Sequence, residues 1–429
     1  MNTNSNPFKQ SEKYVAWISW LVALTAVCVS VYRFPLSSAA FGDEIYYKGE
    51  VQYLAQYGLY NALTQGTSVV YTLLVYLFSK IFQSDYIVTA RILSVIFFLI
   101  SYRLLFACFN LFKGLSNTEK YFGLTFFAAI AESWLWNGLP DMICTSFFLA
   151  GLYLLVSSQG NRRMLLAGIV MFIGFAAKPV VLFAIPGIAV FIFFSHIKNA
   201  GAIRNATRTA LFMFGFCACF IVYHIPGFMA YHRLMLEDKN HSYQAGVMVE
   251  DHNSWNERNV YYAVYNPNHR PTEWYVTWEE VDSFKKQHPE INLRMSYSQF
   301  VKDHFSVWIT GIASKLFLAL PFDIQHGFFF AKWTLINKMI KNFFAIRVIT
   351  LLLILGICFV ERQFIKQNLL LYVIPLSVFL GLSVYLYTPL QNNWMLFCLP
   401  FMALPVARFL VRNVNMLLLF ALQLIYLLL

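Results

Sequence analysis

Several apolar runs in this chain exceed the roughly 18 residues that an α-helix needs to cross a lipid bilayer, and the first follows soon after the amino terminus. Hydrophobic residues make up 59% of the 429 residues, and charged residues make up 12%. Soluble domains carry roughly 25% charged residues, so one large water-soluble core does not fit this composition. The sequence therefore predicts an all-α, polytopic membrane protein.

The apolar runs predict about eleven membrane spans, with the amino terminus in the cytoplasm and the carboxyl terminus outside. Lys9 and Lys13 precede the first run and no small-residue cleavage site follows it, which favours an uncleaved span over a signal peptide. The predicted spans are residues 15–32, 88–112, 121–136, 144–157, 164–177, 180–195, 209–225, 344–360, 369–387, 394–409 and those after 412.

Two further apolar segments, residues 67–82 and 305–321, are short, and the sequence leaves open whether they cross. If 67–82 lies at the outer surface, the loops rich in Lys and Arg fall on the cytoplasmic side, as the positive-inside rule prefers. We therefore interpret 67–82 as a juxtamembrane helix, and 305–321, which Pro321 ends, as a second surface helix. The charges that decide the first assignment are Lys113, Lys120, Arg162, Arg163, Lys198, Arg204 and Arg208.

This topology divides the chain into three parts. An amino-terminal membrane module (1–226) contains the first outer loop (33–87), a long outer loop (227–342) contains the surface helix, and carboxyl-terminal helices (343–429) complete the chain. The net charge of +11 is spread over short loops, which is typical of positive-inside bias, so no nucleic-acid partner is expected. The seven Cys lie in apolar segments and the His lack ligand spacing, so no dedicated metal site is expected.

The outer loops hold the polar residues that indicate chemistry. Asp43 and Glu44 are neighbours in the first loop, Asp141 lies in the second and Lys178 in the third. A carboxylate accepts the proton of an attacking hydroxyl, and a Lys or Arg stabilises a departing phosphate. At a bilayer surface this combination suits group transfer from a lipid-linked phosphate. The long loop adds Arg233, Glu250, Asp251, Glu257, Arg258 and His269.

Each of these residues also has a purely structural interpretation. Asp43 and Asp141 suit helix capping, and Lys178 beside Pro179 suits a side chain that reaches the interface from a helix break. Tyr46 and Tyr47 suit interfacial packing.

The stretch FGDEIYYKGEVQYLAQYGLY resembles the first outer loop of the GT-C superfamily of polyprenyl-phosphate-sugar glycosyltransferases, in the branch that holds protein O-mannosyltransferases and the lipid A aminoarabinose transferase. That loop places an acidic pair, a Tyr and a helix ending in Gly after the first span. This chain has Asp43–Glu44, Tyr46–Tyr47 and Gly58 in that order. Three later segments agree: SDYIVTARILSVI with Arg91, GLPDMICTSFFLAGLYLL with Asp141, and FAAKPVVLFAIPGIAVF with Lys178.

The chain departs from the family pattern at two places. Residues 65–69 read Gln-Gly-Thr-Ser-Val where many relatives have Lys-Pro-Pro or Pro-Pro-Leu, and Asn393-Trp394 stands where relatives have an Arg-Tyr pair. Substrate and phosphate contacts made at those positions in the family therefore do not transfer to this chain.

The resemblance implies a GT-C-like bundle with outer-face juxtamembrane helices and a single displacement. An acceptor hydroxyl would attack the anomeric carbon of a sugar carried on a polyprenyl phosphate, with Asp43 as the base. Glu44 would share that role or hold the loop through the backbone, and Asp141 would be the partner carboxylate. The remaining implied roles are donor-phosphate binding by Lys178 and Arg233, and substrate binding by Tyr46, Tyr47, Arg258 and His269.

The same resemblance implies the partners and the location. The partners are a polyprenyl-phosphate-linked sugar, an acceptor protein, lipid or glycan, and membrane lipids. No cofactor follows with certainty, because divalent-metal use varies across the superfamily. The location is a bacterial cytoplasmic membrane, with the site facing the periplasm or exterior.

Two other classes of protein fit the polytopic pattern. A transporter or lipid-linked sugar flippase would tend to bury ionisable residues at mid-membrane, on broken helices in two related halves. Here the charges gather at one face, and the halves show no similarity. A non-catalytic membrane subunit would be insensitive to the change Asp43→Asn.

Overall fold

The computed structural model describes residues 7–33, 43–65, 68–135, 138–157, 160–195, 202–232, 257, 260–265, 278–293, 295, 297–310, 353–385 and 397–428. Throughout this part of the chain the regular elements are helices and no strand occurs, which confirms the predicted all-helical class. Three of these helical segments are long and apolar enough to cross a membrane: Lys13–Tyr32, Tyr86–Phe109 and Ile203–Ala230. Shorter apolar helices occur at Val69–Phe82, Asp141–Leu155, Pro179–Phe194 and Leu369–Leu382.

The chain divides into two compact units. The first holds Met1–Glu237, Leu355–Val378 and Asn393–Leu429, and the second holds Asp238–Ile354 and Phe379–Asn392. The helices of the amino-terminal part are α1 (Pro7–Arg33), α2 (Asp43–Gln65), α3 (Val69–Phe82), α4 (Tyr86–Phe109), α5 (Asn117–Leu135), α6 (Asp141–Ser157), α7 (Asn161–Ala177), the 3₁₀ helix η1 (Pro179–Ala184), α8 (Ile185–Ser195) and α10 (Ala202–Tyr231). The carboxyl-terminal helices are α17 (Arg362–Gln367), α18 (Leu369–Tyr385), α19 (Leu399–Asn413) and α20 (Met416–Leu428).

Observed helices begin and end near the predicted spans, with differences that have a local cause. α10 starts at Ala202 and ends at Tyr231, beyond the predicted 209–225, because helices continue through polar residues at their ends.

The predicted break at Lys178–Pro179 is present: Lys178 is extended (φ −152°, ψ 121°) and Pro179 opens η1. A residue before Pro avoids the helical region, and Pro suits the first position of a helix. Most of 305–321 and 344–352 lies outside the described residues.

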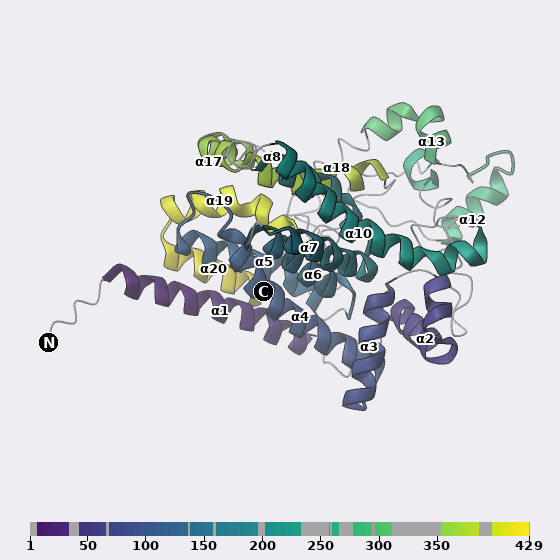
Figure 1. Cartoon of the computed structure of the whole chain (residues 1–429), viewed down its shortest axis with the longest axis horizontal. Coiled ribbons are helices and arrows are strands. Elements are labelled where there is room, and N and C mark those ends of the chain that lie inside the picture. The colour runs from purple at the N-terminus through teal and green to yellow at the C-terminus, as the bar shows by residue number, and fades with distance from the viewer. Residues whose placement is uncertain are drawn as a thin grey trace. The chain divides into compact units, whose positions relative to one another are not determined.

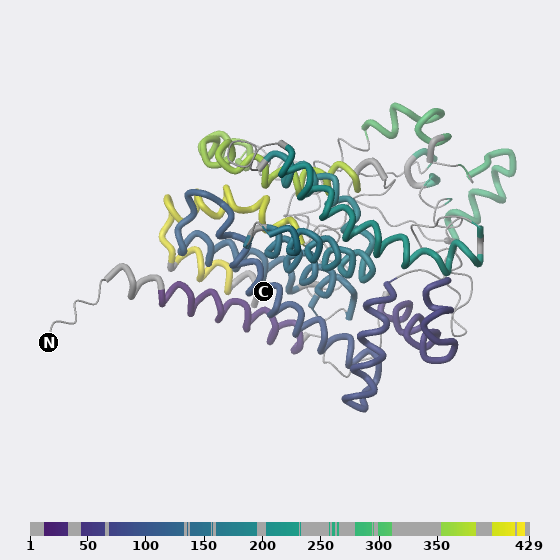
Figure 2. Tube along the Cα trace, viewed as in Figure 1, coloured from purple at the N-terminus to yellow at the C-terminus, as the bar shows by residue number. Residues whose placement is uncertain are grey.

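Hydrogen bonds between helices of the first unit give their relative directions. Ser19 donates to the Tyr121 carbonyl (3.1 Å) and Ser30 donates to the Glu132 carbonyl (2.9 Å), so α1 and α5 run parallel and in register. Phe106 and Phe98 of α4 stack on Tyr121 and Phe127 of α5, so α4 runs antiparallel to α5 and therefore to α1. Tyr102 of α4 donates to the carbonyl of Ser19 in the middle of α1 (2.8 Å). Figure 1 shows α1, α4 and α5 together, and Figure 2 shows the purple tube of α1 along the edge of this group.

The next helices pack closely through glycines. A Cβ on Gly174 of α7 would lie 3.4 Å from the Cys144 carbonyl of α6, and one on Gly151 of α6 would lie 3.2 Å from the Ala167 carbonyl of α7, so these helices are antiparallel. A Cβ on Gly168 of α7 would lie 2.8 Å from the backbone nitrogen of Phe216 in α10. Small residues let helix backbones approach closely where no hydrophobic effect drives association.

Most described basic residues of the first unit collect at one end of its helices. Cys108, late in α4, donates weakly to the Leu149 carbonyl of α6 (3.6 Å), so α4 and α6 end on the same side as α1 and α5 begin. α7 begins on that side because it follows α6 through a short turn. α10 begins there too because it runs parallel to α7: Phe172 packs on Phe216 (6.0 Å) and Phe175 on His224 (6.1 Å between ring centroids). The Lys and Arg residues at this basic end are Lys113, Lys120, Arg162, Arg163, Arg204, Arg208, Arg362, Lys366, Arg408 and Arg412.

Hydrogen bonds and an ion pair connect the carboxyl-terminal helices to the basic end. Arg408 of α19 donates to the Gly114 carbonyl (2.6 Å), and Arg412 pairs with Glu119 (2.6 Å). The Asn368 side chain accepts from the Lys113 backbone N–H (2.8 Å) and donates to the Lys113 carbonyl (3.1 Å). These contacts join segments about 250–290 residues apart in the sequence.

The second unit contains a small core of its own. η2, a π-helical turn (Tyr261–Tyr265), α12 (Trp278–Gln287) and α13 (Tyr297–Asp303) are its described elements. Among its described residues, a cluster of buried apolar side chains consists of Val260, Tyr261, Val281, Leu293 and Phe300. Lys285 of α12 pairs with the buried carboxylate of Glu257 at 2.7 Å.

Candidate functional site

The acidic turn that opens α2 is fixed by an ion pair to α4. Arg91 donates to both carboxylate oxygens of Glu44, at 2.7 and 2.6 Å, and the two side chains are 1% and 2% exposed. A bidentate pair of this kind is geometrically specific. It ties the first turn of α2 to the second turn of α4, and so it fixes the backbone of Asp43, the residue that precedes Glu44 and begins α2.

Gly138 joins this ion pair to the loop before α6. Its backbone N–H donates to Glu44 Oε1 (2.9 Å), and its carbonyl accepts from the Tyr71 hydroxyl of α3. A Cβ on Gly138 would lie 2.8 Å from the Ala90 Cβ and 3.2 Å from the Arg91 backbone nitrogen, so only glycine fits against α4. Burial, with the charges of Glu44, Glu50 and Asp141 nearby, raises the pKa of Tyr71 well above its usual value. The phenol therefore stays protonated and able to donate.

A second buried ion pair joins α6 to the break after α7. Lys178 Nζ lies 2.5 Å from Asp141 Oδ1, and the side chains are 12% and 2% exposed. Asp141 is the first residue of α6, where the helix dipole favours an acid. Its other oxygen, Oδ2, is buried and has no hydrogen-bond partner among the described residues. The extended Lys178 backbone brings this amine to the same end of the helices as Gly138, three residues before Asp141.

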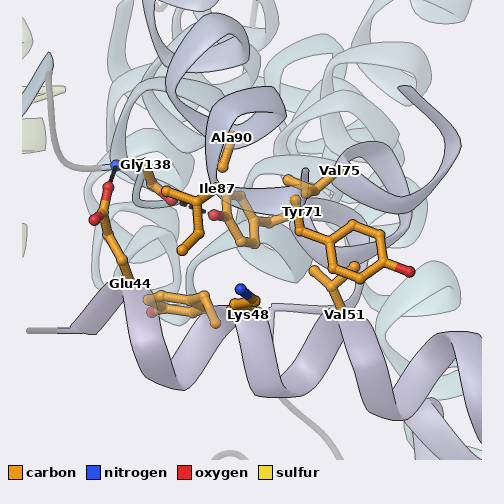
Figure 3. A pocket seen from close by; sticks show the side chains of 10 residues that line it. Glu44, Lys48, Val51, Tyr71, Val75, Ile87, Ala90 and Gly138 are labelled. Atoms are coloured by element: carbon orange, nitrogen blue, oxygen red, sulfur yellow. Dashed lines mark hydrogen bonds between the residues drawn. The ribbon is translucent and has the colours of Figure 1, made fainter. Parts of the chain in front are cut away.

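A small hollow lies beside the first pair, between α2, α3 and α4 (Figure 3). Its volume is about 210 Å³, including its open mouth. Glu44 and Gly138 lie at one side, and Figure 3 shows the Lys48 amino group turned toward the middle. The remaining lining residues are Tyr47, Val51, Tyr71, Val75, Tyr86, Ile87 and Ala90.

The structure brings some sequence-predicted site residues together and leaves others aside. Glu44, Asp141 and Lys178 gather at the end of the helices opposite the basic end. Tyr47 lines the hollow and packs edge-on against Tyr71, with ring centroids 5.1 Å apart, while the Tyr46 hydroxyl donates to Glu50 (2.6 Å). The Asp43 side chain and the whole of Arg233, Arg258 and His269 lie outside the described residues.

Sequence reasoning missed four contributors to this site: Lys48, Glu50, Tyr71 and Gly138. Lys48 follows Glu44 by four residues, a spacing that puts both on one face of a helix. The position of Lys48 beside Glu44 could therefore have been predicted from a helix over this segment. Tyr71 and Gly138 carried no such signal, because their roles depend on how α3 and the 138–141 loop pack on α4.

Gly58 agrees with the expected helix ending in Gly. The regular helix that begins at Asp43 is interrupted at Gly58 (φ 80°, ψ 172°), and a second helical segment continues α2 to Gln65 across this kink.

Within the described part of the chain, no group of three or more His, Cys, Asp or Glu side chains is arranged to hold a metal ion. Comparisons of the chain with protein-family models, with curated proteins and with solved structures gave no match.

Proposed function

We propose that this protein is an integral-membrane glycosyltransferase that moves a sugar from a polyprenyl-phosphate donor to an acceptor hydroxyl at the outer membrane face. One observation carries the proposal. Two buried carboxylate–cation pairs, Glu44–Arg91 and Asp141–Lys178, lie at one end of the helices, beside the turn that begins with Asp43. Buried, paired charges are costly to keep, and such arrangements cluster at functional sites.

The distribution of charge supports an outward-facing site. Most described Lys and Arg residues of the first unit collect at the opposite end of the helices, and the positive-inside rule puts such an end in the cytoplasm. The bundle of about eleven spans in a bacterial cytoplasmic membrane belongs to this proposal, as does the location of the site at the periplasm or exterior.

The packing of α3 supports its proposed place at the membrane surface. It is 14 residues long, or about 21 Å at the usual helical rise, while the hydrocarbon core is about 30 Å thick. Tyr71 and Val75 of α3 share the hollow with Tyr86, Ile87 and Ala90 of α4, so α3 contacts the first two turns of α4.

The proposed reaction is a single displacement. The acceptor oxygen forms a bond to the anomeric carbon, the bond from that carbon to the phosphate oxygen breaks, and the phosphate leaves with the electron pair. Asp43 takes the proton from the acceptor hydroxyl. Glu44 acts as a positioning residue, because its oxygens already accept hydrogen bonds from Arg91 and Gly138. Asp141 holds the Lys178 amine where its charge favours the departing phosphate.

The test is reconstitution of the purified protein with a panel of radiolabelled polyprenyl-phosphate sugars. We expect the wild type to transfer one of them and Asp43→Asn to lose roughly 10²–10⁴-fold in rate, the usual contribution of a general base. Asp282→Asn, the same chemical change at an exposed position of α12, is the matched control and should keep full activity.

Two results would contradict this function. One is a wild type that transfers no sugar but moves a solute or a lipid-linked sugar across the vesicle membrane, which is the behaviour of the transporter alternative. The other is transfer that is unaffected by Asp43→Asn, since the acidic turn would then not take part.

A further inference from the structure

The described cations near the candidate site differ in how firmly they are held. Arg91 donates two hydrogen bonds to a carboxylate that is 2% exposed, and Lys178 lies 2.5 Å from one that is equally buried. Lys48 is different: its side chain is 34% exposed, and its carboxylate partner, Asp85, is 51% exposed and 3.5 Å away. A long, solvent-exposed pair of this kind is weak, so Lys48 can exchange Asp85 for another anion at little cost.

The surroundings of Lys48 restrict what that anion can be. The amino group faces the hollow between α2, α3 and α4, whose walls include the apolar side chains of Val51, Val75, Ile87 and Ala90. A carboxylate also lines the hollow, but Arg91 neutralises it. A cation on an apolar, aromatic wall suits an anionic head group attached to an apolar chain better than a freely hydrated ion.

One exposed apolar side chain extends the wall of the hollow along α3. Phe82 is 47% exposed and follows Val75 by seven residues, which puts the two on the same helix face. An apolar chain lying along this face would reach the hollow with its head group.

We propose that Lys48 binds the phosphate of an isoprenoid phosphate at the mouth of this hollow, which makes it the donor-phosphate contact. The choice of an isoprenoid phosphate rests on the function proposed above, whereas the anion site rests on the geometry of Lys48. The Asp85 carboxylate, which contacts the Lys48 amine at 3.5 Å, is replaced by the phosphate when the lipid binds. Lys178 then remains with Asp141 for the charge that develops on the leaving oxygen.

The test measures equilibrium binding of geranyl phosphate to the full-length protein in detergent by calorimetry, with geraniol and inorganic phosphate as comparison ligands. We expect geranyl phosphate to bind more tightly than either, because only it offers both the charge and the chain. Lys48→Gln should weaken its binding about tenfold or more, and Lys48→Arg should restore most of it. Asp85→Asn should tighten it by removing the competing carboxylate.

Lys80→Gln is the matched control. Lys80 is an exposed lysine of α3 that lies over the Tyr76 ring (5.5 Å) and does not line the hollow. This variant should bind like the wild type, and unchanged melting temperatures should show that all four variants are folded.

The outcomes separate this inference from the proposed function. Geranyl phosphate binding that is equal in the wild type and in a folded Lys48→Gln variant would overturn the Lys48 site, even if sugar transfer occurs. Binding of inorganic phosphate as tight as that of geranyl phosphate would overturn the isoprenoid assignment. Lys48-dependent binding in a protein that transfers no sugar would support the site while the glycosyltransferase function fails.

Discussion

Glu44 and Arg91 illustrate at the residue scale how an acidic motif can have two different uses. Arg91 donates two hydrogen bonds to the Glu44 carboxylate, at 2.7 and 2.6 Å, and both side chains are buried. Its neighbour, Asp43, begins the helix. The adjacent acids therefore have separate roles in our proposal: Glu44 holds the turn in place, and Asp43 is the base.

Replacing Arg91 alone should lower the stability of the fold much more than replacing both members of the Glu44–Arg91 pair. Arg91→Met leaves a buried, uncompensated carboxylate, and breaking a buried pair in this way costs about 3–5 kcal/mol. The double variant Glu44→Gln/Arg91→Met leaves no charge and should be clearly more stable than Arg91→Met. Denaturation of the purified proteins in detergent measures both, with Lys80→Met as an exposed control. Equal stability of Arg91→Met and the double variant would show that burial of the charge is not the cause.

At the scale of elements, the kink in α2 connects two anchored halves of one helix. The first half is fixed to α4 by Glu44 and, more weakly, by Lys48. The second half lies near α10, where a Cβ on Gly227 would be 3.8 Å from the Thr64 carbonyl. Gly58 sits between them with φ 80° and ψ 172°, a conformation that is essentially restricted to glycine.

Gly58→Ala should therefore destabilise the protein although space for the methyl group is free. No atom lies within 4 Å of the Cβ position, so the expected cost is conformational, of about 1–3 kcal/mol. Gly356→Ala is the matched control, because Gly356 has equally free space but lies in the helical segment 353–360.

The two substitutions should shift stability in opposite directions. Alanine in a helix interior is favoured over glycine by about 0.5–1 kcal/mol, so Gly356→Ala should raise the denaturation midpoint in detergent while Gly58→Ala lowers it. A Gly58→Ala protein as stable as the wild type would mean that α2 has no fixed kink.

At the scale of the whole molecule, the two ends of the first unit have different chemistry. One end carries most of the described Lys and Arg residues together with the contacts from α17 and α19. The other carries the buried ion pairs and the hollow. This asymmetry predicts the membrane orientation, because positive charge resists translocation.

Cysteine labelling tests that orientation and the course of α3 in one experiment. In a background without the native cysteines, Gln56→Cys in α2 and Lys80→Cys near the end of α3 should react with an impermeant maleimide added to intact cells. Arg163→Cys at the basic end should react only after permeabilisation. All three positions are exposed.

Each contrary labelling pattern has a distinct meaning. Labelling of Gln56→Cys and Lys80→Cys from opposite sides would show that α3 crosses the membrane. Labelling of Arg163→Cys in intact cells would show that the basic end faces outward, which would contradict the proposed topology.

The sequence by itself determined the helical elements and much of their limits. Apolar runs of membrane length, few charges and the Lys178–Pro179 break are local properties, and a helix closes its hydrogen bonds within one segment. The helical class and the break were therefore predictable from neighbouring residues, as was the place of Asp141 at the start of α6.

Only the tertiary structure decided which polar groups meet. Glu44 contacts Arg91 and Gly138 across 47 and 94 residues of chain, and Asn368 contacts Lys113 across 255. Such contacts depend on which helices run parallel and on where glycines allow a close approach, and neither is encoded in a local pattern. For the same reason the sequence did not show that Lys178 pairs with the buried Asp141, or that Lys48 has only a longer, exposed contact with Asp85.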